Sequence, residues 1–471
     1  MMMDLMVILP LVVVGAGAIL MMLLAAFNSL DKERASIVGL GLFAFAFFVQ
    51  LAVTTDGNVI PYIDVFNGML VANSFTKVAG LIIIAGGFFS SVAAQTYYAQ
   101  NKGFVPEFFS LMMFAVCGML LLTMAAELIT LFIALEIMSL AVYTLVGYDR
   151  KSLVRSEATL KYLMLGAFAG AFYIMGTVLI FAGAKSTSFA VIGAVITETG
   201  FLANPALVGG AFLIVAAFLF KAAAFPFHAW VVDVYDGAPL PVTGFMATAV
   251  KTAVFAVLAN FLIINSELQT SWITYLFYIS VFTMFAGNLI AIGQDNLKRM
   301  LAASGIVHSG YLLIALVAIN TETFNGGVIL FYLAAYAAST LGIFVALSYL
   351  GGEEEKRISF NDFNGLAKVR PYSAAAISIF LLSMAGIPPT AGFMGKFYII
   401  ASAFQSGHAL LAILAIASSV LSMWYYLRLI IAMYFKEPEE AFEISGITLA
   451  PVGTVILAFC VFAISFYPVV L

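Results

Sequence analysis

The chain has 471 residues, of which 64% are hydrophobic and only 9% are charged, whereas soluble domains are about half apolar and a quarter charged. This composition excludes a water-soluble globular protein and indicates a chain whose apolar surface lies in a bilayer. The net charge of −4 and the lack of a basic, aromatic-rich stripe argue against nucleic acid as a partner.

Fourteen apolar runs are long enough to cross a membrane, which takes about 20 residues. The seventh and twelfth are too long for one straight helix, and both contain proline, so we expect two broken helices. The sequence therefore predicts an all-α polytopic membrane protein. The expected spans are 5–27, 36–55, 77–98, 106–124, 128–148, 159–182, 206–235, 240–264, 272–292, 301–319, 324–350, 371–405, 408–434 and 445–470.

The basic residues predict the orientation, because cytoplasmic loops are rich in lysine and arginine. With the N-terminus outside, fourteen of the 20 basic residues fall on inner loops or span ends, and only Lys77 and Lys185 fall outside. An even number of spans then places both termini on the outer side. Four lysines remain, each within a predicted span: Lys161, Lys221, Lys251 and Lys396.

Spans 4–8 and 9–13 form two groups of five, and an odd group size makes the second group begin on the opposite face. Pro226 interrupts the fourth span of the first group, and Pro388 and Pro389 interrupt the fourth span of the second. Matched broken spans point to a transport site, although the alternative is that these are ordinary proline kinks. We expect two inverted five-helix repeats within the organisation 1–105 (spans 1–3), 106–265, 266–436 and 437–471 (span 14).

The carboxylate of Glu136 lies near the middle of span 5. Such a group costs roughly 3 kcal/mol of insertion free energy unless it is paired or hydrated, so we expect a cationic neighbour, with Lys221 as the first candidate. Burial disfavours a charged ammonium and a nearby carboxylate favours it. A changed distance between Glu136 and Lys221, or changed hydration, would therefore load or unload the amine. The alternative is a static ion pair that fixes helix packing.

Three further ionisable groups accompany this pair. Glu157 and Lys161 have the i,i+4 spacing of a helical ion pair at the inner start of span 6, where they either serve a relay or simply reach the membrane surface. His228 follows the first break and is interpreted as a structural or peripheral relay residue. Their role stays open at this point.

Lys251, His308 and Lys396 lie in later spans. Lys251 stands at the centre of span 8 and has no acid in its own span, while Lys396 follows the second break. His308 lies in span 10, between the two broken spans, and histidine titrates near physiological pH. It is either a proton relay or a hydrogen-bonded packing residue.

Motifs for redox or nucleotide chemistry are missing from the sequence. It contains no GxGxxG, P-loop, HExxH, cysteine cluster or pair of histidines suited to haem. We therefore expect no cofactor and no metal in this chain, and we expect its energy to come from partner subunits.

Two motifs resemble a known family. Residues 220–230 read FKAAAFPFHAW and residues 233–239 read DVYDGAP, and both are similar to motifs of the antiporter-like membrane subunits of respiratory complex I. The second motif, the lysine in span 12 and a chain that ends after span 14 resemble the subunit N family. The likeness departs at Val232, where the family usually has proline, and at Gly305, where it usually has serine.

This resemblance implies proton translocation coupled to quinone reduction in neighbouring subunits. It implies partner subunits that carry FMN and iron–sulfur clusters, K-like and M-like neighbours within membrane lipid, and a place in the bacterial inner (plasma) membrane. It assigns proton transfer to Glu136, Lys221, Lys251 and Lys396, with Glu157, Lys161 and His308 as auxiliary groups.

Two alternatives remain. One is a subunit of a multi-component cation/proton antiporter, which uses a related fold and the same lysines. The other is a structural membrane subunit in which every buried charge is locked. Purification together with flavin and iron–sulfur subunits separates the first from the leading hypothesis, and replacement of Lys251 separates the second.

Overall fold

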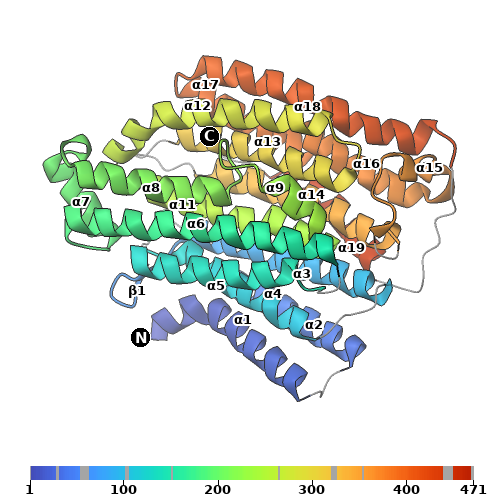
Figure 1. Ribbon diagram of the computed structural model, residues 1–471, viewed down its shortest axis with the longest axis horizontal. Coiled ribbons are helices and arrows are strands. Elements are labelled where there is room, and N and C mark those ends of the chain that lie inside the picture. The colour runs from blue at the N-terminus through green and yellow to red at the C-terminus, as the bar shows by residue number, and fades with distance from the viewer. Residues whose placement is uncertain are drawn as a thin grey trace.

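The computed structural model describes residues 2–27, 31–53, 63–100, 106–149, 152–263, 266–319, 326–352, 355–438 and 449–467. Its helices run nearly parallel in one elongated bundle (Figure 1). Within the described residues, eleven helices are long and apolar enough to cross a membrane, and shorter apolar helices accompany them. The protein is therefore a multi-pass membrane protein.

The predicted spans correspond to helices of the structure. Eleven are single helices: α1 (Met2–Ala26), α2 (Lys32–Ala52), α3 (Ser74–Gln100), α4 (Glu107–Met124), α5 (Leu128–Val146), α6 (Leu153–Ala184), α12 (Ser266–Ile292), α13 (Leu297–Val317), α14 (Gly326–Leu350), α18 (Ala409–Phe435) and α19 (Ala450–Ser465). The eighth span combines α10 (Leu240–Phe245), the π-helical turn η2 (Met246–Val250) and α11 (Lys251–Ile263). The seventh and twelfth are broken, into α8 (Pro205–Lys221) with α9 (Val231–Gly237) and α16 (Pro371–Ala385) with α17 (Ala391–Gln405).

Burial divides these helices into two classes. In their most apolar stretches, all residues of α10–η2–α11 and of α13 are buried, and so are 94% of the residues of α14. In α6 the buried share is only 33%. A helix that is apolar all round is suited to a protein core or to lipid. The three central helices therefore form the core, and helices such as α6 present apolar side chains outward.

At the first break, two backbone groups are bonded by side chains of α12 and α13. After α8 ends, the carbonyl of Ala222 accepts a hydrogen bond from Ser309 Oγ of α13 at 2.6 Å. The amide of Phe225 donates to Thr283 Oγ1 of α12 at 3.0 Å. Backbone groups freed at membrane depth need such partners, so the first break is anchored by the second group of spans.

The second break has a different construction. Helix α16 ends at Ala385, and Gly386 adopts a left-handed φ of 83°, a conformation that glycine takes without steric cost. Helix α17 starts again at Ala391, and the amide of Gly392 donates to Ser383 Oγ at 3.1 Å. The two predicted broken helices are thus confirmed.

The relation between the two groups of five remains a prediction. Each group begins with a packed helix pair, α4 with α5 and α12 with α13. The predicted boundaries after 105 and 265 lie outside the described residues.

Several short elements were not predicted. Strands β1 (Ile63–Val65) and β2 (Leu70–Ala72) form an antiparallel hairpin, and α7 (Phe189–Thr199) with the 3₁₀ turn η1 (Phe201–Ala203) follows α6. The turn η4 (Asn361–Phe363) and helix α15 (Leu366–Val369) lie between α14 and α16. In Figure 1, α7 marks the left-hand end of the bundle, where α1 begins, and α15 marks the right-hand end.

Candidate functional site

Lys221, the last residue of α8, is buried and points to α5. Its Nζ donates hydrogen bonds to Ser139 Oγ at 2.9 Å and to Tyr143 OH at 3.0 Å. The same nitrogen lies 5.1 Å from the ring centroid of Tyr143 and 5.6 Å from that of Tyr162, within the range of cation–π attraction. Hydroxyls and aromatic rings therefore surround the first lysine.

Glu136 lies on the same face of α5 as these hydroxyls, three residues before Ser139. Its carboxylate lies against Gly170 of α6: a Cβ atom built onto this glycine would be 3.5 Å from Glu136 Oε1. Among the described residues, no ion pair joins Glu136 directly to Lys221, although the two groups interact electrostatically. The expected pair is therefore separated, with serine and tyrosine hydroxyls as the immediate partners of the amine.

Lys251 is buried at the centre of the bundle. Its Nζ donates to the carbonyl of Gly305 on α13 at 2.5 Å and lies 5.1 Å from the ring centroid of Tyr336 on α14. The π-helical turn Met246–Val250 directly precedes it, and such turns are frequent at functional sites. A backbone oxygen, and not a carboxylate, thus holds the central amine.

His308 bonds to two tyrosines. Its Nδ1 lies 2.6 Å from Tyr332 OH and its Nε2 lies 3.2 Å from Tyr426 OH, while its ring centroid lies 4.6 Å from that of Tyr336. A cavity of about 10 Å³ adjoins the ring, close to the space one water molecule needs. It is lined by His308, Tyr332, Ala335, Tyr336, Ser339, Ser383, Met384 and Gly392, and so leads toward the second break.

Lys396 lies buried in α17, beside the second break. Its Nζ donates to the carbonyl of Ala385, the last residue of α16, and to Ser419 Oγ of α18, each at 3.0 Å. It lies 5.0 Å from the ring centroid of Tyr311, whose own centroid is 6.2 Å from that of His308. The structure therefore brings Lys396 and His308 close to the same tyrosine ring.

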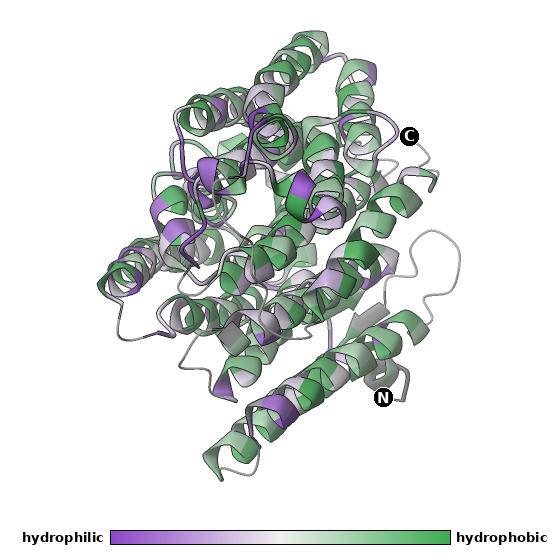
Figure 2. Ribbon diagram, turned by 90° about the vertical axis from the view of Figure 1, so that its right-hand side faces the viewer, coloured by the Kyte–Doolittle hydropathy of each residue, from purple (hydrophilic) through white to green (hydrophobic). Residues whose placement is uncertain are grey.

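Glu157 and Lys161 occupy a different place. They form an ion pair of 2.8 Å at the surface of α6, and Lys161 also lies 3.2 Å from Asp233. Arg299 of α13 continues the series, 3.2 Å from both Asp233 and Asp236. Figure 2 looks onto this end of the bundle and shows hydrophilic residues on its helix ends and loops. The auxiliary pair thus belongs to a surface charge network.

The residues of the breaks are partly exposed. Pro226, Pro388 and Pro389 are all exposed, as the turns face outward. His228 is half-buried, its ring lies 5.5 Å from that of Phe225, and its Nδ1 has no hydrogen-bond partner among the described residues. The structure does not bring His228 into the row formed by the buried lysines and His308.

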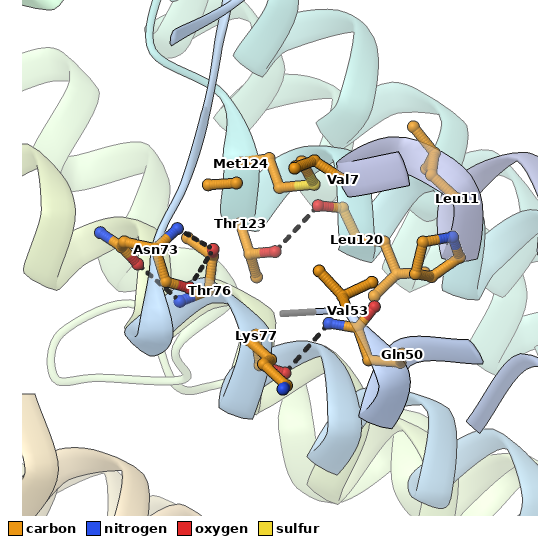
Figure 3. A pocket seen from close by; sticks show the side chains of 12 residues that line it. Val7, Leu11, Gln50, Val53, Asn73, Thr76, Lys77, Leu120, Thr123 and Met124 are labelled. Atoms are coloured by element: carbon orange, nitrogen blue, oxygen red, sulfur yellow. Dashed lines mark hydrogen bonds between the residues drawn. The ribbon is translucent and has the colours of Figure 1, made fainter. Parts of the chain in front are cut away.

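A separate cavity of about 20 Å³ lies between α1, α2, α3 and α4. Figure 3 shows its polar contacts, including the bond from Gln50 Nε2 to the Lys77 carbonyl at 3.0 Å and that from Thr123 Oγ1 to the Leu120 carbonyl at 2.8 Å. None of the predicted site residues lines it, so it is distinct from the lysine row.

Comparisons with known proteins show the family of the chain. Residues 125–422 match the family model described as NADH:quinone oxidoreductase/Mrp antiporter, TM. NADH-quinone oxidoreductase subunit N of Trichlorobacter lovleyi is 36% identical, over 96% of this chain and 91% of that protein. Subunit N of Chloroflexus aggregans is 37% identical, over 93% and 89% respectively.

The chain belongs to the subunit N family of NADH-quinone oxidoreductases.

Solved structures place this family member's fold among respiratory and antiporter complexes. A chain of respiratory complex I from Thermus thermophilus aligns with a TM-score of 0.81 at 29% identity, covering 97% of this chain and 96% of that one. A chain of the Mrp complex from Dietzia sp. DQ12-45-1b aligns with a TM-score of 0.84 at 19% identity, covering 98% and 93%. The second likeness shows the fold alone.

Sequence reasoning missed most partners of the buried lysines. Ser139 and Tyr143 follow Glu136 by three and seven residues, so the helical period gave a signal for both. Ser419 lies far from its lysine along the chain, and no local pattern marked it. Gly305, one of the two departures from the family motifs, supplies the carbonyl for Lys251.

Proposed function

We propose that this family member translocates protons as a membrane subunit of a redox-driven NADH-quinone oxidoreductase, through Glu136, Lys221, Lys251, His308 and Lys396. The observation that supports this is the set of hydrogen-bond partners of the three buried lysines, Lys221, Lys251 and Lys396. Each amine is held by hydroxyl or carbonyl oxygens, without a carboxylate in direct ion-pair contact among the described residues.

The physical argument concerns the balance between charged and neutral amine. Burial disfavours an ammonium, and hydrogen-bond acceptors favour it. A direct buried carboxylate would add a strong, fixed attraction and lock the charge. Amines held by neutral oxygens can instead lose a proton when hydration or a distant charge changes.

The tyrosines and His308 supply the groups between the amines. The ring of Tyr336 lies close to both Lys251 and His308, and the ring of Tyr311 lies close to both His308 and Lys396. A water in the cavity beside His308 would complete a hydrogen-bonded path toward the second break, since the site is polar and has room for about one molecule.

Electron transfer belongs, in this proposal, to partner subunits that hold FMN and iron–sulfur clusters, with quinone as acceptor. We place the chain in the bacterial inner membrane with both termini outside, between K-like and M-like subunits. The outward apolar residues of α6 and α18, among them Phe168 and Trp424, provide surface for lipid and for these neighbours.

The test is Lys251→Met in the intact complex, with proton translocation and quinone reduction measured in membrane vesicles. Because methionine fills similar space without a titratable nitrogen, we expect translocation to fall about tenfold or more, equivalent to about 1.4 kcal/mol in the barrier. Lys77→Met is the matched control. It removes a lysine from the separate cavity between α1, α2, α3 and α4 and should leave translocation unchanged. Unchanged pumping in Lys251→Met, at unchanged quinone reduction, would assign the chain a purely structural role.

A multi-component cation/proton antiporter is the second candidate, since the matching family model includes Mrp antiporters. Metal cations such as Na⁺ prefer oxygen cages, whereas amines line this row. Purification of the native assembly decides: flavin and iron–sulfur subunits support the leading proposal, and their replacement by other antiporter subunits supports this one.

A further inference from the structure

A buried ion pair outside the lysine row joins Lys298 at the start of α13 to Glu355 of the loop after α14. The two side chains are only 2% and 9% exposed, and Lys298 Nζ lies 2.5 Å from Glu355 Oε2. The same nitrogen donates to the carbonyls of Asp236 at 2.8 Å and Ala238 at 2.7 Å, at the end of α9. All three ammonium protons therefore have acceptors.

The other oxygen of Glu355 meets the helix that carries Lys251. Its Oε1 accepts from the amide of Leu240, the first residue of α10, at 3.1 Å. A carboxylate is favourable at a helix N-terminus, where amides lack partners and the helix dipole is positive. Since α10, η2 and α11 follow without interruption, Glu355 fixes one end of the Lys251 helix.

The loop that carries Glu355 is itself fastened to α13. The amide of Leu297 donates to the Ile358 carbonyl at 2.7 Å, and the amide of Phe360 donates to the Asp295 carbonyl at 3.3 Å. The loop with Glu355 is thus held to the start of α13, and the bond from Glu355 to Leu240 links this part of α13 to α10.

This link bears on the geometry at the centre of the bundle. Lys251 lies eleven residues after Leu240, about 16 Å along the helix, and its amine bonds to Gly305 of α13. α13 also carries His308, while its main packing partners are α12 and α9. The Leu240–Glu355–Lys298 connection at the helix ends therefore helps set the distance from the Lys251 amine to the Gly305 carbonyl of α13.

We propose that Glu355 is a positioning residue for Lys251: through Lys298 and the Leu240 amide it sets the separation of the Lys251 amine from the Gly305 carbonyl and from His308. The inference rests on the proposed proton translocation. Glu355 is no part of the proton path in this scheme. At the predicted inner end of the bundle, its carboxylate meets the Lys298 ammonium and the Leu240 amide, and Tyr97 and Arg155 also interact with it.

The test compares Glu355→Gln with Glu437→Gln in the intact complex. Both remove one negative charge from the same end of the bundle. The Lys368–Glu437 pair is 53% and 83% exposed, so it serves as the control. Subunit content, quinone reduction, proton translocation per quinone reduced, and the pH dependence of translocation are measured in membrane vesicles.

For Glu355→Gln we expect about threefold lower translocation per quinone and a pH profile shifted by about half a unit, because the Lys251–Gly305 hydrogen bond is altered. Glu437→Gln should match the unaltered complex in both. A Glu355→Gln complex with an unshifted profile overturns the inference, as does an equal shift in Glu437→Gln, which would trace the effect to net surface charge.

If Glu355→Gln does not assemble, Glu355→Asp takes its place, since it keeps the charge but shortens the reach by one methylene. It should assemble and still shift the pH profile, and an unshifted profile overturns the inference. Lys251→Met is measured alongside. Loss of translocation there together with unshifted Glu355 variants refutes the positioning role alone, whereas normal translocation in Lys251→Met refutes the proposed function itself.

Discussion

The two helix breaks hold their lysines in different ways. At the first, Lys221 reaches across to another helix and bonds to two hydroxyls of α5, with Glu136 on the same face of that helix. At the second, Lys396 turns back and bonds to the carbonyl of Ala385 in the other half of its own broken helix, with Ser419 as a second acceptor.

This difference separates an adjustable site from a fixed one. The partners of Lys221 belong to α5 while the lysine belongs to α8, so a small displacement of one helix against the other would change both its hydrogen bonds and its distance from Glu136. The partner of Lys396 is the C-terminal end of α16, whose unpaired carbonyls and negative dipole end favour a cation. We therefore expect the first break to respond to neighbouring charges and the second to hold its amine in place.

The largest effects are expected for Lys396→Arg and Lys221→Arg, one at each break. Arginine keeps the positive charge and can donate to the Ala385 carbonyl, but it does not release its proton in proteins. The complex should assemble, while proton translocation in vesicles falls about tenfold or more at either break. Normal translocation in Lys396→Arg would show that the group at the second break need not lose a proton. Lys396 would then serve only to bond the C-terminal end of α16.

Hydropathy and proline placement predicted the spans and both breaks, because the bilayer imposes one length on every spanning helix. Helix α7 was missed, since its eleven residues are too few to span a membrane. Its apolar side packs against α6 and α12, and Phe189 meets Phe261 of α11. Nothing in a local run of residues distinguishes such a helix from a loop between spans.

The site was predictable in its charges but not in their partners. A lysine in an apolar span is visible in the sequence. The oxygen that accepts its hydrogen bond depends on tertiary packing, which the sequence does not show. Glu355 shows the limit most clearly. It ends a run of three glutamates in the sequence, a pattern typical of exposed loops, yet its own side chain is buried and bonded to Lys298 and Leu240. The Glu136–Lys221 interaction was expected as a direct pair because sequence carries no distances.

An intermediate effect is expected for Glu136→Gln, which removes the carboxylate but keeps the side-chain size. Translocation should fall about threefold, because the charged form of Lys221 loses a favourable neighbour. In a double-mutant cycle with Lys221→Arg the second change should add little, whereas with Lys396→Arg the two losses should multiply. Multiplication in both cycles would mean that Glu136 does not act through Lys221.

The smallest effects are expected from removal of the serine hydroxyls that bond to the lysines. The size of this effect should differ between the two breaks. Ser139→Ala leaves Lys221 with Tyr143 as its hydrogen-bond partner in the described part of the chain. Ser419→Ala leaves Lys396 with the Ala385 carbonyl, a stronger acceptor that no substitution removes. We expect about a twofold loss of translocation for Ser139→Ala and less for Ser419→Ala. Tyr143→Phe should resemble Ser139→Ala, since it removes the other hydroxyl. If Ser419→Ala proves the more damaging change, the backbone carbonyl is not what holds the second lysine, and the distinction between an adjustable and a fixed break is wrong.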